Sequence, residues 1–562
     1  MKRKVIAILL IAVLFLLGLG GCQSGTSKST DPPAGKTDPP AGKTDPPAGK
    51  TRLDPAQFKG VTVKVTSYQQ DSPHNEAVLA ELNKRLGITT EWYICPASEG
   101  WAATDRLLAA NPDIDIMYNG RGRMEDYVSK GYLYDLTSHL DRTEEFPNLA
   151  KQSFDLARMY PTADGKHYSL PRLGPGGYGG TMGYTLAVRE DWLAQCNLDM
   201  PETIADLDEI LVAFKAMDPS KYPLFTVSSK GMLGAMGLVL SGAFTDCATG
   251  WWDDNGTLRH PIQDPGWKNF VAKVREWYEK GYLHPEFITA NTQATTQLMS
   301  AGEIGVLTSW CTTAINPNKA LMEENPKHRF EYTKGTLSGD KPAKLVGNSF
   351  ASEFTNINAN TKNIDAVLYF LDRMGDRDIR MLTHYGIEGL NYRIENRKLI
   401  RETGDKAYVG QYSTYGAETE MVVTFEHENE LFDPGPLGNH YIDSQKPNWF
   451  RIFYSDERMK QIIYEPDTGL IYDYTTGDNE YYELSTVAST YITEMLTDMV
   501  TGKLGMDQWD AKIAELENIA LNQMTKERNE QWEKYGKKVY KSDGKQVIYE
   551  KDMLPWMKEH VW

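Results

Sequence analysis

Residues 31–51 repeat the heptapeptide DPPAGKT three times. The repeats contain no apolar side chain larger than Ala or Pro, so this stretch has nothing to bury and cannot join a folded core. A proline-rich spacer of this length reaches roughly 30–90 Å. The repeats therefore separate a short leader from a long folding body, which begins at about Leu53.

The leader has the order of a bacterial export signal. Positions 2–4 are basic, positions 5–19 are apolar, and the sequence LGGC ends at Cys22. The apolar run is short for a membrane span and is closed by small residues, which favours cleavage over permanent insertion. The LGGC sequence resembles the lipobox of bacterial lipoproteins, in which the cysteine receives a diacylglyceryl group and becomes the new N-terminus. A plain secretory signal followed by an unmodified cysteine is the alternative.

This interpretation predicts a signal peptide over residues 1–21 and a tether over residues 22–53, lipidated at Cys22 with fatty acids such as palmitate. Two acyl chains hold a protein stably on a bilayer, whereas one gives marginal binding. We therefore expect the protein on the extracellular face of the cell membrane, held by its lipid anchor.

The composition excludes some classes of partner and of site. The chain has 60 Lys and Arg against 77 Asp and Glu, a net charge of −17. Such a surface is a poor partner for nucleic acid. The other four cysteines are far apart and form no CxxC pair, so we expect no zinc site, redox motif or cofactor. Disulfides and buried thiols both stay open for these cysteines, which are Cys95, Cys196, Cys247 and Cys311.

The body begins with alternating strand and helix patterns. The spacing predicts a strand over 61–65, a helix from Ser72-Pro73 to Gly87, a strand over 88–94, an amphipathic segment over 101–110 and a strand over 114–118. Alternation of this kind builds a parallel sheet, and ligands collect beyond the carboxyl ends of its strands. The candidates at that edge are Gln69, Gln70, Trp101 and Asn119, for which an ordinary loop role is the alternative.

Further along, the chain resembles the extracellular solute-binding lipoproteins of ABC importers, the family-1 type that includes maltose-binding protein and the LplA-like and alginate-binding proteins. The resemblance is carried by DGKHYSLP (164–171), YTLAVREDWLAQCNLDMPETIADLDEIL (184–211), GYLHPEFI (281–288), LMSAGEIGVLTSW (298–310) and HYGIEGLNY (384–392). Within the second segment, Thr203 is a predicted N-cap and Asp206 completes a capping-box-like start.

The resemblance implies an α/β, two-lobed, periplasmic-binding-protein-like fold of type II, with a hinge and a cleft that closes on ligand. Its first crossing between lobes would lie near 168–184 and its return near 347–354, before a helix over 364–374. The N-terminal lobe would comprise 54–175 and about 350–435, and the C-terminal lobe about 176–349 and 436–562. Helices over 491–535 would cover the second lobe.

The resemblance also supplies candidate ligand-binding residues. Trp310 matches an aromatic residue that follows a G-x-x-G-V strand and faces the ligand, although a core role is the alternative. Asn255-Gly256 indicates a hairpin turn beside two neighbouring tryptophans, at least one of which should face outward. The further candidates are Tyr178, Trp251, Trp252, Asn348, Tyr385, Glu388 and Trp449.

The resemblance implies a carbohydrate ligand, most consistent with an oligosaccharide. The 13 Trp and 31 Tyr of the chain agree with this, because aromatic rings stack on sugars. A peptide or another polyol stays open. The predicted partners are a small-molecule ligand and the transmembrane subunits of an ABC permease, with the protein itself a monomer. No metal is expected: where the alginate-binding relatives carry a calcium loop, AMDPSKYPLF (216–225) holds a single acidic residue, Asp218.

Two alternative functions fit the same features. A surface glycosidase would need two carboxylates across a cleft, but the sequence has no GxSxG or HExxH motif, and no enzyme is predicted. A protein that presents its ligand to a sensor kinase instead of a permease would have the same sequence.

Overall fold

The computed structural model describes residues 52–67, 75–94, 101–119, 124–151, 153–159, 161–172, 184–227, 231–289, 292–325, 327–347, 353–395, 398–408, 461–464 and 480–536. The chain divides into two units, 1–49 and 50–562, and every described residue belongs to the second unit. The predicted leader, Cys22 and the repeats lie outside the described residues. Two sheets with separate cores define what we call the first lobe and the second lobe.

The first lobe is built on a five-stranded sheet in the order β2-β1-β3-β12-β4. Its strands are β1 (Thr62–Ser67), β2 (Thr89–Ile94), β3 (Ile116–Asn119), β4 (Ser169–Arg172) and β12 (Glu353–Ile357). The predicted parallel order is confirmed for β2, β1 and β3. It does not extend to the whole sheet, since β12 pairs antiparallel with both β3 and β4. A strand that enters from a distant part of the chain needs no crossover helix, so its direction is free of that constraint.

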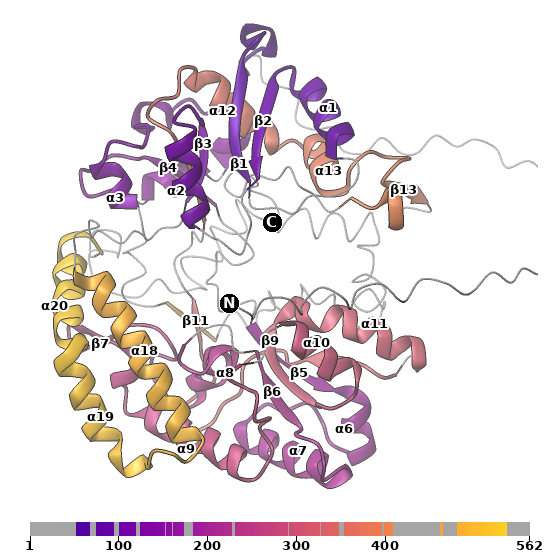
Figure 1. The fold of residues 1–562 in the computed structure, drawn as a ribbon, viewed down its shortest axis with the longest axis vertical. Coiled ribbons are helices and arrows are strands. Elements are labelled where there is room, and N and C mark those ends of the chain that lie inside the picture. The colour runs from indigo at the N-terminus through magenta and orange to yellow at the C-terminus, as the bar shows by residue number, and fades with distance from the viewer. Residues whose placement is uncertain are drawn as a thin grey trace, which may run out of the picture. The chain divides into compact units, whose positions relative to one another are not determined.

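Helices cover this sheet, and Figure 1 shows α1 beside β2 with α13 next to it. Val63 and Val65 of β1 are buried in one core with Leu82 of α1 and Phe370 of α12. Each such side chain contributes roughly 1.5–3 kcal/mol to folding. The helices are α1 (Asn75–Leu86), α2 (Trp101–Ala110), α3 (Met124–Ser129), α4 (Pro147–Lys151), α5 (Ser153–Met159), α12 (Ile364–Met374) and α13 (Arg377–Tyr385), with short turns η1 (Pro55–Phe58) and η4 (Thr137–His139).

The predicted helix boundaries agree closely with these bounds. Helix α12 begins and ends where the sequence pattern places it, because the Asn363 side chain accepts a hydrogen bond from the Ala366 N–H and Gly375 follows the last turn. Helix α1 ends before Gly87, whose φ of 71° is a left-handed conformation that favours glycine. The expected start of α1 at Ser72-Pro73 lies outside the described residues.

The second lobe is built on a four-stranded sheet in the order β10-β5-β9-β6. Strand β9 pairs antiparallel with β5 and parallel with β6, so β9 and β6 end at the same edge. The strands are β5 (Tyr184–Arg189), β6 (Leu224–Thr226), β9 (Val306–Trp310) and β10 (Phe330–Tyr332).

The C-terminal helices pack on the core of the second lobe, as the resemblance implied, but they begin at Glu480 and not at the expected residue 491. Leu496 and Val500 of α18 are fully buried in one cluster with Trp267 and Trp277 of α9. Figure 1 shows α18, α19 and α20 side by side on the flank of this lobe. The helices are α6 (Glu190–Cys196), α7 (Ile204–Met217), α8 (Gly234–Leu240), α9 (Gly266–Glu279), α10 (Thr292–Ser300), α11 (Ile315–Glu324), α18 (Glu480–Val500), α19 (Trp509–Leu516) and α20 (Asn522–Gln531).

Helix α7 begins with the predicted capping box. The Thr203 side chain accepts a hydrogen bond from the Asp206 N–H at 3.1 Å, and the Asp206 carboxylate accepts one from the Thr203 N–H at 2.9 Å. The two residues thereby satisfy donors that an uncapped helix leaves unpaired.

The chain passes from the sheet of the first lobe to that of the second between β4 and β5, and returns between β10 and β12. Strand β11 (Leu345–Gly347) lies between these two and belongs to a separate small sheet. The predicted limits of the lobes, including those that fall outside the described residues, stay predictions.

The small sheets pair β11 with β15 (Ile462–Tyr464), β13 (Tyr392–Glu395) with β14 (Lys398–Arg401), and β7 (Trp252–Asp254) with β8 (Thr257–Arg259). The remaining short turns are η5 (Ser241–Ala243), η6 (Pro261–Gln263), η7 (Cys311–Ala314), η8 (Gly404–Lys406), η11 (Met506–Gln508), η12 (Glu517–Leu521) and η13 (Trp532–Gly536).

Among the described helices, none combines the length and the apolar character needed to cross a membrane.

Candidate functional site

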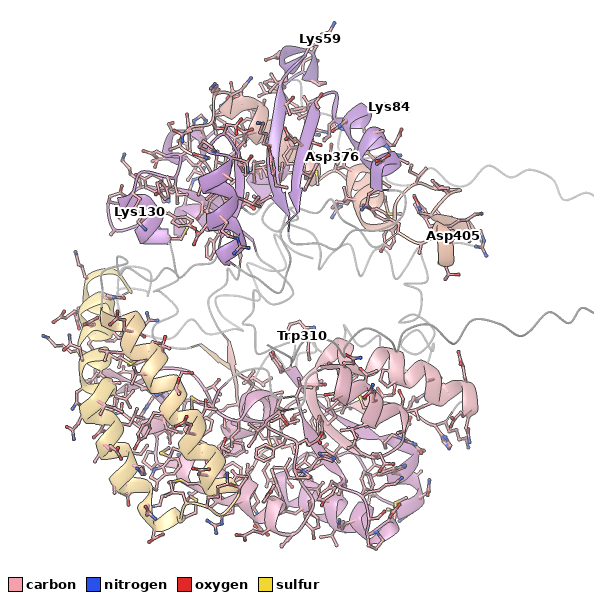
Figure 2. All side chains as sticks on the ribbon, in the orientation of Figure 1. Lys59, Lys84, Lys130, Trp310, Asp376 and Asp405 are labelled. Carbon is pink, nitrogen blue, oxygen red and sulfur yellow. The ribbon has the colours of Figure 1, made fainter. Side chains whose placement is uncertain are left out.

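Trp310 is the last residue of β9 and lies opposite Tyr184, the first residue of β5. The two rings meet edge to face, with centroids 5.3 Å apart and an interplanar angle of 82°. The four preceding residues of β9 are fully buried, whereas Trp310 is partly exposed. Figure 2 shows its side chain projecting beyond the end of the strand. A rigid strand therefore presents an aromatic face, braced by a second ring, at the carboxyl edge of the sheet.

The local sequence explains how Trp310 is placed. Helix α10 precedes β9. Gly305 allows the chain to pass closely over two rings, because a Cβ at this position would lie 2.5 Å from both Phe214 and Trp192. After Trp310 the chain turns at once through η7 into α11. Main-chain N–H groups at the start of a helix are available to polar ligand groups.

A strained turn that the sequence analysis missed follows β6 at the same edge. Met232, Leu233 and Gly234 have φ values of 53°, 62° and 58°, a run of left-handed backbone that is costly for the two residues with side chains. The turn leads into α8, whose Met236 N–H donates to Thr226 Oγ1 of β6 at 3.0 Å. The glycines at 231, 234 and 237 were the only sequence signal for this turn.

The structure gives Trp251 packing partners and places Trp252 at the start of β7. The expected hairpin turn is confirmed, since Asn255 and Gly256 have φ values of 54° and 91° between β7 and β8. The Trp251 ring meets His260 edge to face at 5.5 Å and packs with Leu258 and Trp532. Both indoles are partly buried. Their ligand-binding role stays a prediction.

His260 belongs to the same corner of the second lobe. Its Nδ1 accepts a hydrogen bond from the Ile262 N–H at 3.3 Å and so caps the η6 turn. Burial lowers the pKa of His260 from 6.5 to about 4, because the protonated ring loses its solvation.

Tyr385 and Glu388 lie in the first lobe, at the end of α13 and in the turn that follows it. Tyr385 is 9% exposed and contacts Tyr392 edge to face at 6.0 Å. Glu388 is exposed. Gly386, with a φ of 83°, leaves room for Asn391, whose Oδ1 accepts a hydrogen bond from the Ile387 N–H at 2.8 Å. The turn is therefore held by its own hydrogen bonds, and ligand binding by either residue stays a prediction.

The other candidates are placed only in part. Asn119 is the last residue of β3 and Trp101 the first of α2, and their side chains are not among those described. Their ligand-binding role stays a prediction. Further candidates lie outside the described residues altogether: Gln69, Gln70, Tyr178, Asn348 and Trp449.

Within the described part of the chain, no group of three or more His, Cys, Asp or Glu side chains is arranged to hold a metal ion. At the position of the calcium loop, Asp218 accepts hydrogen bonds from the Ser220 hydroxyl at 2.6 Å and the Ser220 N–H at 3.0 Å. These bonds lower the pKa of Asp218 below its ordinary value.

Comparisons with known proteins agree with this architecture. The polygalacturonan/rhamnogalacturonan-binding protein YtcQ of Bacillus subtilis (strain 168) is 25% identical over 258 residues, which cover 45% of this chain and 50% of YtcQ. Lipoprotein LipO of the same organism is 23% identical over 361 residues, 61% of this chain and 68% of LipO. The chain thus matches about half the length of YtcQ.

A solved structure shares the fold. An HMO-binding, ABC-transporter-associated solute-binding protein from Bifidobacterium longum infantis ATCC 15697 superposes with a TM-score of 0.59 at 17% identity, covering 84% of this chain and 98% of that one.

A family model described as bacterial extracellular solute-binding protein matches residues 77–376. This range is just over half of the 562 residues and runs from α1 through the whole second-lobe sheet, with Trp310, to α12. The chain belongs to the family of bacterial extracellular solute-binding proteins.

Proposed function

We propose that this protein is the lipid-anchored substrate-binding protein of an ABC importer, which captures an oligosaccharide outside the cell and delivers it to a membrane permease. The observation that carries the proposal is the position of Trp310, the partly exposed end of an otherwise buried strand. The relatives support the ligand class, since YtcQ is named for pectic polysaccharides and the structural neighbour for binding HMO.

The geometry of the aromatic pair suits a sugar. The edge-to-face contact with Tyr184 orients the Trp310 ring, and the ring is partly exposed, so its exposed surface can stack on the C–H surface of a pyranose ring. Amides and carboxylates then hydrogen-bond the hydroxyl groups.

Calorimetry of the full chain in detergent, titrated with pectic, fructan and milk-type oligosaccharides, tests this function. We expect at least one oligosaccharide to bind and Trp310→Ala to weaken it by roughly 0.5–1.5 kcal/mol. Trp192→Ala is the matched control: this indole is also partly buried in the second lobe, but it packs on Phe214 and Arg189. Equal loss of affinity in both variants, or no loss in Trp310→Ala, would show that Trp310 packs within the lobe and does not bind the ligand.

We further propose that the ligand leaves unaltered. Mass spectrometry of the bound oligosaccharide after long incubation should recover it intact, whereas shortened products would support the glycosidase alternative.

The anchor is tested separately. Cys22→Ser should release the protein from membranes and abolish incorporation of labelled fatty acid while leaving oligosaccharide affinity unchanged. Retention of Cys22→Ser on the membrane would instead indicate an uncleaved signal or a second anchor.

A further inference from the structure

The first lobe contains a cavity of about 420 Å³ that the proposed function does not use. It lies between the second half of α2, the end of α3 and the residues before β3, and its lining includes Asp105, Tyr127, Lys130, Tyr132 and Asn360. Pro112, also in the lining, precedes β3, whereas the predicted ligand residue Asn119 ends that strand. Met117 of β3 lines the cavity as well, so the cavity follows β3 from Pro112 to within two residues of Asn119. Its volume falls within the range of small-molecule sites, roughly 300–1,000 Å³.

Tyr132 lines this cavity with an exposed ring, and hydrogen bonds fix its backbone. The Tyr132 side chain is 49% exposed, although its N–H donates to Tyr127 O at 3.0 Å and its carbonyl accepts from the Ala359 N–H at 2.9 Å. The Tyr127 ring lies 5.8 Å from the Tyr132 ring, and the Tyr127 hydroxyl donates to Asp105. Rings held in place before a ligand arrives lose little entropy on binding.

The second lobe provides an internal comparison for Tyr132. The sequence Lys-Gly-Tyr-Leu occurs at 130–133 and again at 280–283. In both copies a helix ends at a left-handed glycine, with φ of 69° at Gly131 and 67° at Gly281. In both, the tyrosine N–H donates to the carbonyl five residues earlier, at 3.0 Å for Tyr132 and 2.8 Å for Tyr282.

The two tyrosines nevertheless have different surroundings. Tyr282 is partly buried against the core of the second lobe and lies 6.0 Å from the Lys280 ammonium. Tyr132 instead leaves half of its ring in solvent at the cavity. The shared turn accounts for the glycine and the buried leucine in both copies, but it does not account for the exposure of Tyr132.

The polar groups of the lining indicate the class of ligand. The lining contains one carboxylate, Asp105, and one ammonium, Lys130. Their charges cancel, so the cavity does not select a strongly charged ligand. Figure 2 shows Lys130 just after α3 on the flank of this lobe. Asn358 is fixed in the lining, since its Nδ2 donates to Ile114 O at 2.8 Å and its Oδ1 accepts from the Asn360 N–H at 2.9 Å.

We propose that this cavity is a second carbohydrate site, which takes one neutral sugar unit stacked on Tyr132 with its hydroxyl groups on Asp105, Lys130 and Asn360. It operates independently of Trp310.

Saturation-transfer NMR on the full chain in detergent tests the site, with methyl α-D-glucopyranoside and methyl β-D-galactopyranoside as probes. We expect transfer to at least one probe, retained in Trp310→Ala and weakened roughly three- to tenfold in Tyr132→Ala. Tyr282→Ala, the matched copy of the turn, should leave it unchanged.

Ala109→Trp provides a second variant if Tyr132→Ala does not fold. Ala109 is an exposed residue of α2 in the cavity lining, so an indole there should fill the cavity without disturbing the core. Loss of binding in Ala109→Trp supports the proposal. Absence of transfer from both probes, undiminished transfer in Tyr132→Ala, transfer retained in Ala109→Trp, or transfer that disappears in Trp310→Ala would each overturn it. The last result would leave the proposed function intact.

Discussion

The Arg52 guanidinium donates to Asp372 Oδ2 at 2.7 Å and to Asp376 Oδ1 at 3.0 Å, directly after the last DPPAGKT repeat. Asp372 is 1% exposed, and its other oxygen accepts hydrogen bonds from the Asn148 and Leu149 N–H groups at 2.7 and 3.1 Å. The first residue of the described body is thus bound to α12 and to the N-cap of α13, and the Asp372 carboxylate links it to the start of α4.

Removing this guanidinium should destabilise the first lobe. Arg52→Ala leaves a buried carboxylate without its cation, which costs roughly 2–4 kcal/mol in the free energy of unfolding. Burial already raises the pKa of Asp372 above its ordinary value, and Arg52 opposes this shift, so the variant raises the pKa further. The loss should therefore be larger at neutral pH, where the carboxylate is charged, than in acid. Urea unfolding at several pH values measures it.

Two variants control for this interpretation. Lys84→Ala removes an exposed cation, 77% accessible, that pairs with Glu81 on the surface of α1 and should cost less than about 0.5 kcal/mol. Asp372→Asn introduced together with Arg52→Ala should recover part of the stability. An Arg52→Ala variant no less stable than Lys84→Ala would show that the pair is solvated in solution.

The capping box of α7 should contribute measurably to the free energy of unfolding. Thr203→Ala removes the acceptor of the Asp206 N–H and should lower the unfolding free energy by about 1 kcal/mol, whereas Thr203→Ser should retain most of it. Hydrogen bonds from the Glu202 and Thr203 N–H groups lower the pKa of Asp206, so the contribution of this carboxylate is present above its unfolded value of 3.8 and is lost as the pH falls. Similar stabilities for the Ala and Ser variants would contradict this account.

Features that depend on a few neighbouring residues could be predicted from the sequence. The capping box at Thr203, the limits of α12 and the Asn255-Gly256 turn each follow from local hydrogen bonds and backbone angles. The antiparallel direction of β12 and the contact between Arg52 and Asp372, 320 positions apart, depend on tertiary structure that no local pattern encodes.

The candidate site shows the same limit. An indole or phenol has enough apolar surface to suit a core and a sugar equally, so the sequence could not separate Trp310, at a strand end, from Trp251, which packs with Leu258 and Trp532. The strained turn at Met232 and Leu233 escaped detection because left-handed backbone is unexpected for those residue types.

His260 should make the second lobe sensitive to acid. Its pKa falls from 6.5 to about 4 on folding, so the unfolded chain takes up a proton first as the pH drops. Stability should decline between these two values by at most about 1.4 kcal/mol per pH unit. His260→Asn retains an acceptor for the Ile262 N–H but does not titrate, and it should flatten this part of the stability profile. An unchanged slope in thermal unfolding would exclude His260 as the cause.

The last prediction links packing to the site through Gly305. A methyl group at this position would lie 2.5 Å from Trp192 and Phe214, so Gly305→Ala should overpack the second lobe and cost roughly 1–3 kcal/mol. Because Gly305 directly precedes β9, the strain should also shift Trp310 and weaken oligosaccharide binding. Trp192→Leu in the same chain removes one of the two clashing rings while Phe214 remains, so it should restore part of the stability and part of the affinity. Restored stability without restored affinity would show that β9 responds to Gly305 independently of the Trp192 ring.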